Sequence, residues 1–165
     1  MPGEQPTVYL TKRFVLALFV VLGSFMGSRA LAQHLVVSVW ETGTVLLELN
    51  LSQDPTWEVR WNHSVAGFLV RDLYRYEDGK MLLAATHAPD FAAGLGYIPG
   101  RGRLRSDGRG GYWIRAIDEA VPGNRYLLRV GAPRVDHRVV HAGRTYSLSA
   151  RAAGERVVVA VQEAR

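Results

Sequence analysis

The sequence contains no cysteine among its 165 residues. Disulfide bonds, thiol catalysis, cysteine-ligated metals and a lipid anchor on cysteine are therefore all excluded. Lysine is also scarce, because 18 of the 20 basic residues are arginine, and the net charge is +5. Residues 33–165 carry 17 basic and 14 acidic residues. This is an ordinary surface balance, which argues against nucleic-acid binding.

A long apolar run occurs at the N-terminus, where Lys12 and Arg13 precede the stretch Phe14–Leu22. The tripeptide Ala30-Leu31-Ala32 then supplies a small-x-small cleavage pattern. Together these features predict that residues 1–32 are a signal peptide or a membrane anchor. A membrane-spanning helix needs about 20 apolar residues, so the shorter run favours cleavage before Gln33 over an inner-membrane anchor through residues 14–27. Either outcome predicts an exported, periplasmic domain.

Residues 33–165 are predicted to form one all-β domain. Short apolar runs alternate with turn residues, and no window outside the leader has a helical stripe. About nine or ten short strands indicate a single antiparallel sandwich or a partly open barrel, preceded by the leader or anchor helix. Val157–Val161 is apolar on both faces, which predicts a central strand covered on both sides. Residues 88–111, rich in Gly, Pro and Arg, are predicted to be a long loop.

The domain is organised around a predicted hairpin over residues 57–76. The residues Trp57, Val59, Trp61 and His63 alternate, so all four share one face of the first strand. If the loop is centred on residues 66–68, His63 lies opposite Asp72, within hydrogen-bond reach. Such a pair either binds a ligand or is a half-buried structural pair whose two side chains are each other's hydrogen-bond partners. The sequence leaves both interpretations open.

Other polar residues are weaker candidates. Ser64 follows His63, but neighbours on a strand point to opposite faces, and no Gly-x-Ser-x-Gly motif is present. His137 and His141 could join His63 in a three-histidine metal site. Since no His-Glu-x-x-His motif occurs, we expect no metal, no cofactor and no catalytic residues.

A glycine-rich segment and an arginine cluster follow each other in the predicted loop. Gly94 and Gly96 lie in a stretch that lacks the strand and helix of a phosphate-binding loop, so they are candidates only for loop geometry around a ligand. The four arginines that come next could contact an anion, lipid headgroups or an acidic partner, or could simply be solvated: Arg101, Arg103, Arg105 and Arg109.

Several of these residues resemble a known bacterial family, the domain of unknown function 1850 (DUF1850). The family typically shows an aromatic-x-His-Ser-Val core, a Val-x-Glu-x-aromatic element and a Ser-Phe-Gly-Ala-Gly-Leu-Pro-like loop. Here these read as residues 61–65, 70–74 and 90–96, and the similarity covers about residues 55–162. Asp72 replaces the usual Glu and keeps the carboxylate, whereas Asp90, Ala92 and Gly96 depart from the loop pattern.

The resemblance implies a small exported protein, often encoded beside tripartite ATP-independent periplasmic (TRAP) transporters of the TAXI type. We therefore expect a periplasmic, non-enzymatic accessory module that works with a transporter subunit, either the binding protein or the permease. The alternative is a small-ligand or metal-binding β domain that uses His63, Asp72 and His137, and a cell-envelope hydrolase ranks last. Carried over from the family motifs, the positions to test are His63, Ser64, Asp72, Gly94 and His137.

Overall fold

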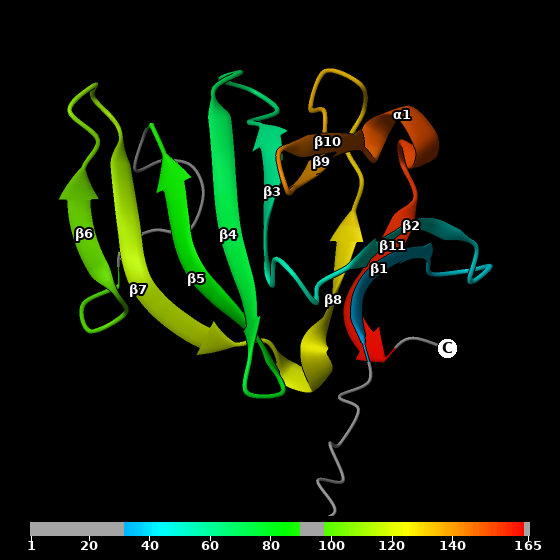
Figure 1. Ribbon diagram of the computed structural model, residues 1–165. Coiled ribbons are helices and arrows are strands. Elements are labelled where there is room, and N and C mark those ends of the chain that lie inside the picture. Colours follow the sequence, from blue (N-terminus) through cyan, green and yellow to red (C-terminus); the bar gives the residue numbers. More distant parts are fainter. Residues whose placement is uncertain (1–31, 90–97, 164–165) are drawn as a thin grey trace, which may run out of the picture.

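The computed structural model describes residues 32–89 and 98–163, which form two antiparallel sheets facing each other (Figure 1). The smaller sheet has the strand order β2-β1-β11-β8. Its members are β2 (Val45–Asn50), β1 (Gln33–Val39), β11 (Arg156–Glu163) and β8 (Arg125–Arg129). Neither sheet closes on itself, so the predicted antiparallel sandwich is confirmed and a closed barrel is excluded for this part of the chain.

The larger sheet has the order β10-β9-β3-β4-β5-β7-β6. Its strands are β10 (Arg144–Ser147), β9 (Arg138–His141), β3 (Thr56–Asn62), β4 (Leu69–Glu77), β5 (Lys80–Ala88), β7 (Tyr112–Ala120) and β6 (Arg103–Ser106). Helical structure in the described residues is limited to the 3-10 turn η1 (Pro122–Asn124) and the single-turn helix α1 (Ser149–Ala152). None of these helices is long and apolar enough to cross a membrane.

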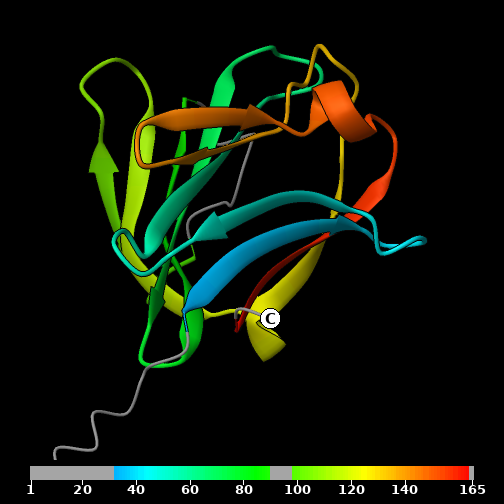
Figure 2. The same ribbon diagram turned by 45° about the vertical axis from the view of Figure 1, so that its right-hand side comes forward.

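The core lies between the two sheets, as the turned view shows (Figure 2). Alternate residues of each strand point inward because strand side chains alternate between faces. Leu35 and Val37 of β1 and Val157 and Val159 of β11 are completely buried, and they meet the Trp57 face of the larger sheet. This alternating burial is the pattern that the sequence predicts for a sandwich.

Strand β11 is central in its sheet, but only one of its faces is covered. Val158 and Ala160 point away from the core and are half-buried. The prediction that Val157–Val161 is covered on both sides is therefore wrong. A continuous apolar run indicated double coverage, whereas in this sheet the outer face has no second layer within the described residues.

The predicted hairpin of β3 and β4 is present, with a longer loop than expected. Strand β3 ends at Asn62, which pairs with Leu69, and residues 63–68 form the loop. Asp72 consequently lies opposite Val59 rather than His63. The expected His63–Asp72 pair is wrong because its geometry depended on the loop centre, which register alone cannot reveal.

A further expectation is corrected along the chain. Residues 88–111 are not one continuous loop, because Arg103–Ser106 form edge strand β6 against β7. Strand β10 stops at Ser147, and helix α1 follows. The leader predicted over residues 1–32 lies almost entirely outside the described residues.

Two bulges change which residues face the core. Between β4 and β5 the register shifts at Ala84, so that Asp72 pairs with Thr86. Between β5 and β7, the three residues from Ala116 to Asp118 lie opposite Ala84. Ala116 and Asp118 have positive φ angles of 53° and 50°. Because an extra residue reverses the alternation of a strand, these bulges turn Thr86 inward and bring Glu119 opposite Leu83.

Candidate functional site

A pocket of about 310 Å³ opens between the two sheets beside the bulges. Strand β4 contributes Asp72 and Tyr74, and strand β8 of the other sheet contributes Tyr126. The remaining lining residues come from β5, the segment before β6, and the end of β7 with the turn after it: Leu83, Arg101, Glu119, Ala120, Val121 and Pro122. The pocket therefore joins a few polar groups to an apolar and aromatic wall, which is the usual make-up of a small-molecule site.

Asp72 is the most perturbed acid that lines this pocket. Its Oδ1 accepts a hydrogen bond of 2.6 Å from the hydroxyl of Thr86, a side chain that is completely buried. Burial removes water from the carboxylate and raises the pKa of Asp72 to about 6, although the Thr86 hydroxyl and the charge of Arg101 both act in the opposite direction. This partly buried carboxyl group therefore gains or loses its proton near pH 6.

A stack of three aromatic rings links the sheets, and two of its members, Tyr74 and Tyr126, line the pocket. The ring of Tyr74 lies 5.6 Å from that of Trp57 and 5.5 Å from that of Tyr126, nearly parallel to both. Burial raises the pKa values of both tyrosines, so their hydroxyl groups stay protonated. The indole Nε1 of Trp57 is buried and has no hydrogen-bond partner among the described residues.

Arg101 and Glu119 form the polar rim. Their ion pair joins Nη2 of Arg101 to Oε2 of Glu119 at 2.5 Å, while Nε of Arg101 is buried without a partner in the described part of the chain. The next residue, Gly102, has a φ of +73°, and a Cβ there would lie 2.8 Å from the carbonyl oxygen of Arg115 and 2.9 Å from Ile114. Glycine is thus needed for the backbone to approach β7 so closely, and this approach sets the position of Arg101.

The predicted histidine site is not assembled. His63 lies in the hairpin loop, where its Nδ1 accepts a hydrogen bond from the backbone N–H of Ala66 and its ring stacks on Phe68 at 5.0 Å. Ser64 is exposed in the same loop. The imidazole therefore stabilises its own loop, as a structural residue would.

His137 has a separate structural position. It is 9% exposed, its Nδ1 accepts a hydrogen bond of 2.8 Å from the N–H of Gly131, and its ring stacks on Trp61 at 5.8 Å. Burial lowers the pKa of His137. His141 instead contacts the carbonyl oxygen of Asp54. Within the described residues no three His, Asp or Glu side chains lie close enough to hold a metal ion.

The arginine cluster is divided by the fold. Arg101 turns into the pocket, whereas Arg103 and Arg105 are exposed on edge strand β6 and Arg109 is exposed in the turn after it. Gly94 and Gly96 lie outside the described residues. The four arginines therefore do not form one binding site.

Among the residues that line or adjoin the pocket, Thr86, Glu119 and Tyr126 were not predicted as site residues. Simple alternation from Met81 and Leu83 places Thr86 on the outer face, and only the bulge at Ala84 turns it inward. Nothing in the sequence marks that bulge. Tyr126 could have been recognised, because an aromatic residue after a Pro-Gly-Asn turn is a reasonable choice for the inner face of a strand.

An unpredicted cluster also lies on the outer face of the larger sheet. Nε2 of His87 donates a hydrogen bond of 2.8 Å to Oδ2 of Asp107, and the imidazole ring lies 4.8 Å from that of Trp113. The guanidinium groups of Arg71 and Arg115 lie 5.0 Å and 4.7 Å from the same indole ring. The hydrogen bond from His87 lowers the pKa of Asp107. Oδ1 of Asp107 also accepts hydrogen bonds from the backbone N–H groups of Arg109 and Gly111, which fixes the turn that carries Arg109.

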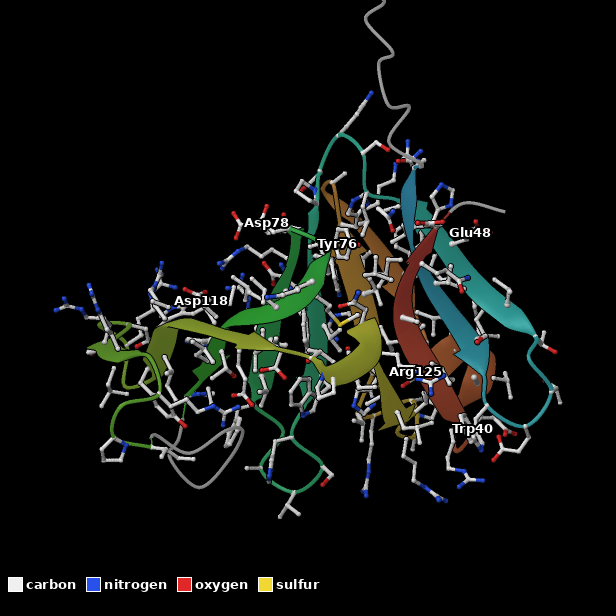
Figure 3. The ribbon with its side chains drawn as sticks, turned by 90° about the horizontal axis from the view of Figure 1, so that it is seen from below. Trp40, Glu48, Tyr76, Asp78, Asp118 and Arg125 are labelled. Atoms are coloured by element: carbon white, nitrogen blue, oxygen red, sulfur yellow. The ribbon has the colours of Figure 1, made fainter. Side chains whose placement is uncertain are left out.

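The outer face of the smaller sheet is hollowed and carries three large exposed apolar side chains among polar ones. Trp40 is 49% exposed, and Val45 and Leu127 are each 55% exposed. Val45 and Leu127 belong to one row of paired residues that crosses all four strands. The row runs in the order Val45, Ser38, Val158, Leu127. Trp40 directly follows β1. We call this surface the Trp40 face. A hollow of about 790 Å³ lies on it, and Figure 3 shows Trp40, Glu48 and Arg125 around this sheet.

Comparison with known proteins gives one match. The family model described as Domain of unknown function (DUF1850) matches residues 57–148. Comparisons with curated proteins and with solved structures each returned no match. The matched range contains every residue that lines the Asp72 pocket, together with almost all of the larger sheet, whereas most of the Trp40 face lies outside it. Because more than half of the chain fits this model, the protein belongs to the DUF1850 family.

Proposed function

We propose that this protein is an exported, non-enzymatic accessory module that works with a TAXI-type TRAP transporter. Two expectations from the sequence support the proposal. The pattern of residues 1–32 predicts export to the periplasm, and the DUF1850 family is one whose members are often encoded beside such transporters. A domain of this kind acts by binding its partner, so it needs an exposed surface suited to another protein.

The Trp40 face carries the proposal. Large apolar patches are uncommon on the surfaces of monomeric proteins and often mark sites of protein association. Here three large side chains, Trp40, Val45 and Leu127, are about half exposed on one sheet. Tryptophan is enriched at the centres of interfaces, where it fills a pocket of the partner. Glu48 and Arg125 flank the hollow and could fix the orientation of the partner.

The test is co-purification of the tagged protein from membranes that contain a TAXI-type binding protein and permease. Wild type is compared with Trp40→Glu and Leu127→Glu, which place a charge in the proposed interface. Val65→Glu is the matched control, because Val65 is 90% exposed but lies in the β3–β4 loop. All three positions are at the surface, so each variant is expected to fold.

We expect Trp40→Glu and Leu127→Glu to reduce recovery of the transporter subunit at least about tenfold, the effect of losing about 1.4 kcal/mol of binding. Val65→Glu should leave recovery unchanged. Failure of the wild-type protein to associate in membranes that contain both transporter subunits would refute the function. Association that survives both Trp40→Glu and Leu127→Glu would refute the assigned surface.

The alternative function, ligand or metal binding by His63, Asp72 and His137 together, loses its basis. His63 is engaged by its own loop, and His137 is held by Gly131 and Trp61. Of the three residues, Asp72 is the one that lines the inter-sheet pocket.

A further inference from the structure

We propose that the Asp72 pocket binds a small molecule that carries a primary ammonium group and, a few bonds away, a hydrogen-bond acceptor, the simplest such molecule being an amino acid. This inference does not depend on the proposed transporter partner, because the pocket lies between the sheets and the Trp40 face lies outside them.

The case for an ammonium group begins with Asp72. Its carboxylate is largely buried, and in the described residues it accepts one hydrogen bond, from Thr86. A buried carboxylate with few donors is costly unless a cation pairs with it. The two carboxylates of the lining, Asp72 and Glu119, outnumber the single guanidinium of Arg101. An ammonium ion placed beside Asp72 would supply both the missing charge and the missing donors.

The aromatic wall suits the same group. Tyr74 and Tyr126 line the pocket on the side where Asp72 lies, and their stacked rings are contributed by the two different sheets. Cations are attracted to aromatic rings, and the attraction is greatest where water is excluded. A carboxylate group placed beside Asp72 would gain nothing from these rings and would be repelled by Asp72.

The case for an acceptor rests on Arg101. Its Nε is buried and has no hydrogen-bond partner in the described part of the chain, although Nη2 of the same side chain pairs with Glu119. Buried donors without partners are rare in folded proteins. A carboxylate or hydroxyl oxygen of the ligand would satisfy this donor while the ammonium group contacts Asp72.

The remaining lining limits the size of the ligand. Leu83, Val121 and Pro122 form an apolar side of the pocket. A volume of about 310 Å³ lies at the small end of the range for ligand sites, so the pocket suits a single amino acid or amino alcohol rather than a peptide.

The experiment is titration calorimetry of the protein with each of the twenty common amino acids, followed by a matched series for the best binder. For leucine the series is L-leucine, 3-methylbutylamine, which lacks the carboxylate, and 4-methylpentanoate, which lacks the amine. We expect the amino acid to bind with a Kd below about 1 mM, the amine to bind more weakly, and the acid not to bind.

Variants then assign the contact. Asp72→Asn should weaken binding of the amino acid by about tenfold to a hundredfold, the effect of losing a charge-assisted hydrogen bond. Asp72→Glu should retain binding, because the carboxylate is kept. Asp118→Asn is the matched control. Asp118 lies in the bulge between β5 and β7, beside the pocket residue Glu119, but its carboxylate pairs with Arg75 and does not line the pocket.

Proton release gives an independent reading. An ammonium group beside Asp72 keeps it ionised, so binding at pH 6 should release about half a proton, and binding at pH 8 almost none. The groups that face Asp72 are Thr86, Tyr74, Tyr126, Arg101 and Glu119. Burial raises the pKa values of both tyrosines, so they stay protonated over this range of pH.

Three results would overturn the inference. The first is that no amino acid and no corresponding amine binds. The second is that 4-methylpentanoate or another deaminated acid binds as tightly as its amino acid. The third is that Asp72→Asn binds like Asp118→Asn. An amine that binds as tightly without its carboxylate would refute the role of Arg101. None of these results bears on co-purification with a transporter, so the two proposals fail separately.

Discussion

Replacement of Asp72 by asparagine tests the electrostatics of the inter-sheet pocket. The carboxylate is largely buried, and its loss of hydration outweighs the hydrogen bond from Thr86 and the charge of Arg101. The result is a pKa raised from 3.8 to about 6. Asparagine has nearly the same shape, and its amide oxygen can accept the same hydrogen bond from Thr86, but it does not titrate.

The sign of the effect follows from linkage between protonation and folding. Because the pKa of Asp72 is higher in the folded protein than in the unfolded chain, the folded state binds the proton more tightly. The contribution of the Asp72 proton to the unfolding free energy is complete below about pH 3.8 and is lost as the pH rises through 6. One pKa unit corresponds to 1.36 kcal/mol, so the full shift amounts to about 3 kcal/mol of unfolding free energy.

The assay is urea denaturation at fixed pH values between 4 and 8, applied to wild type, Asp72→Asn and the control Asp118→Asn. Other groups that titrate in this range, His137 among them, contribute equally to each protein and cancel in the differences. We expect the unfolding free energy of wild type to fall by about 2 to 3 kcal/mol relative to Asp72→Asn as the pH rises, with most of the change between pH 4 and 6.

Asp118→Asn should follow wild type over the same range of pH. Curves for wild type and Asp72→Asn that stay parallel within about 0.5 kcal/mol, the usual error of additivity, would refute the reasoning. They would mean that Asp72 is as well hydrated in the folded protein as in the unfolded chain.

Three further outcomes are expected. Gly102→Ala should lower the unfolding free energy by at least about 1 to 2 kcal/mol in urea denaturation, because alanine is strained at a φ of +73° and its Cβ meets β7; wild-type stability would contradict this close approach. Met81→Ala should lower the unfolding free energy by about 2 to 5 kcal/mol, since Met81 is completely buried. A loss below about 1 kcal/mol would mean that neighbouring side chains fill the cavity. His137→Asn keeps an acceptor for Gly131 and cannot titrate. Because burial lowers the pKa of His137, wild type should lose stability relative to this variant as the pH falls below 6.5, and equal loss in both would refute the burial of the imidazole.

Much of the fold could be predicted from local patterns. Alternation identified β3 and β4 and the inner position of Trp57. Asp78-Gly79 is a dipeptide typical of two-residue hairpin turns, and it joins β4 to β5 with positive φ angles at both residues. These features depend on neighbours in the sequence, which is why a reading of short windows found them.

The predictions that failed depended on register. The expected His63–Asp72 pair required a loop centre near residue 67, whereas the observed hairpin is centred between residues 65 and 66. Thr86 and Glu119 face inward because bulges interrupt the alternation of β5 and β7. A shift of one residue moves a side chain to the opposite face, and the local sequence pattern does not reveal such a shift.

The sequence by itself determined the fold class, the family and the chemical character of Asp72, since alternation, turn residues and short motifs are local properties. Only the tertiary structure decided that this carboxyl group lies in a pocket with Arg101 and Glu119, and that no other described residues form a layer over the outer face of β11. The physical reason is that burial, and with it the pKa of an acid or the exposure of a valine, depends on which distant strands pack together.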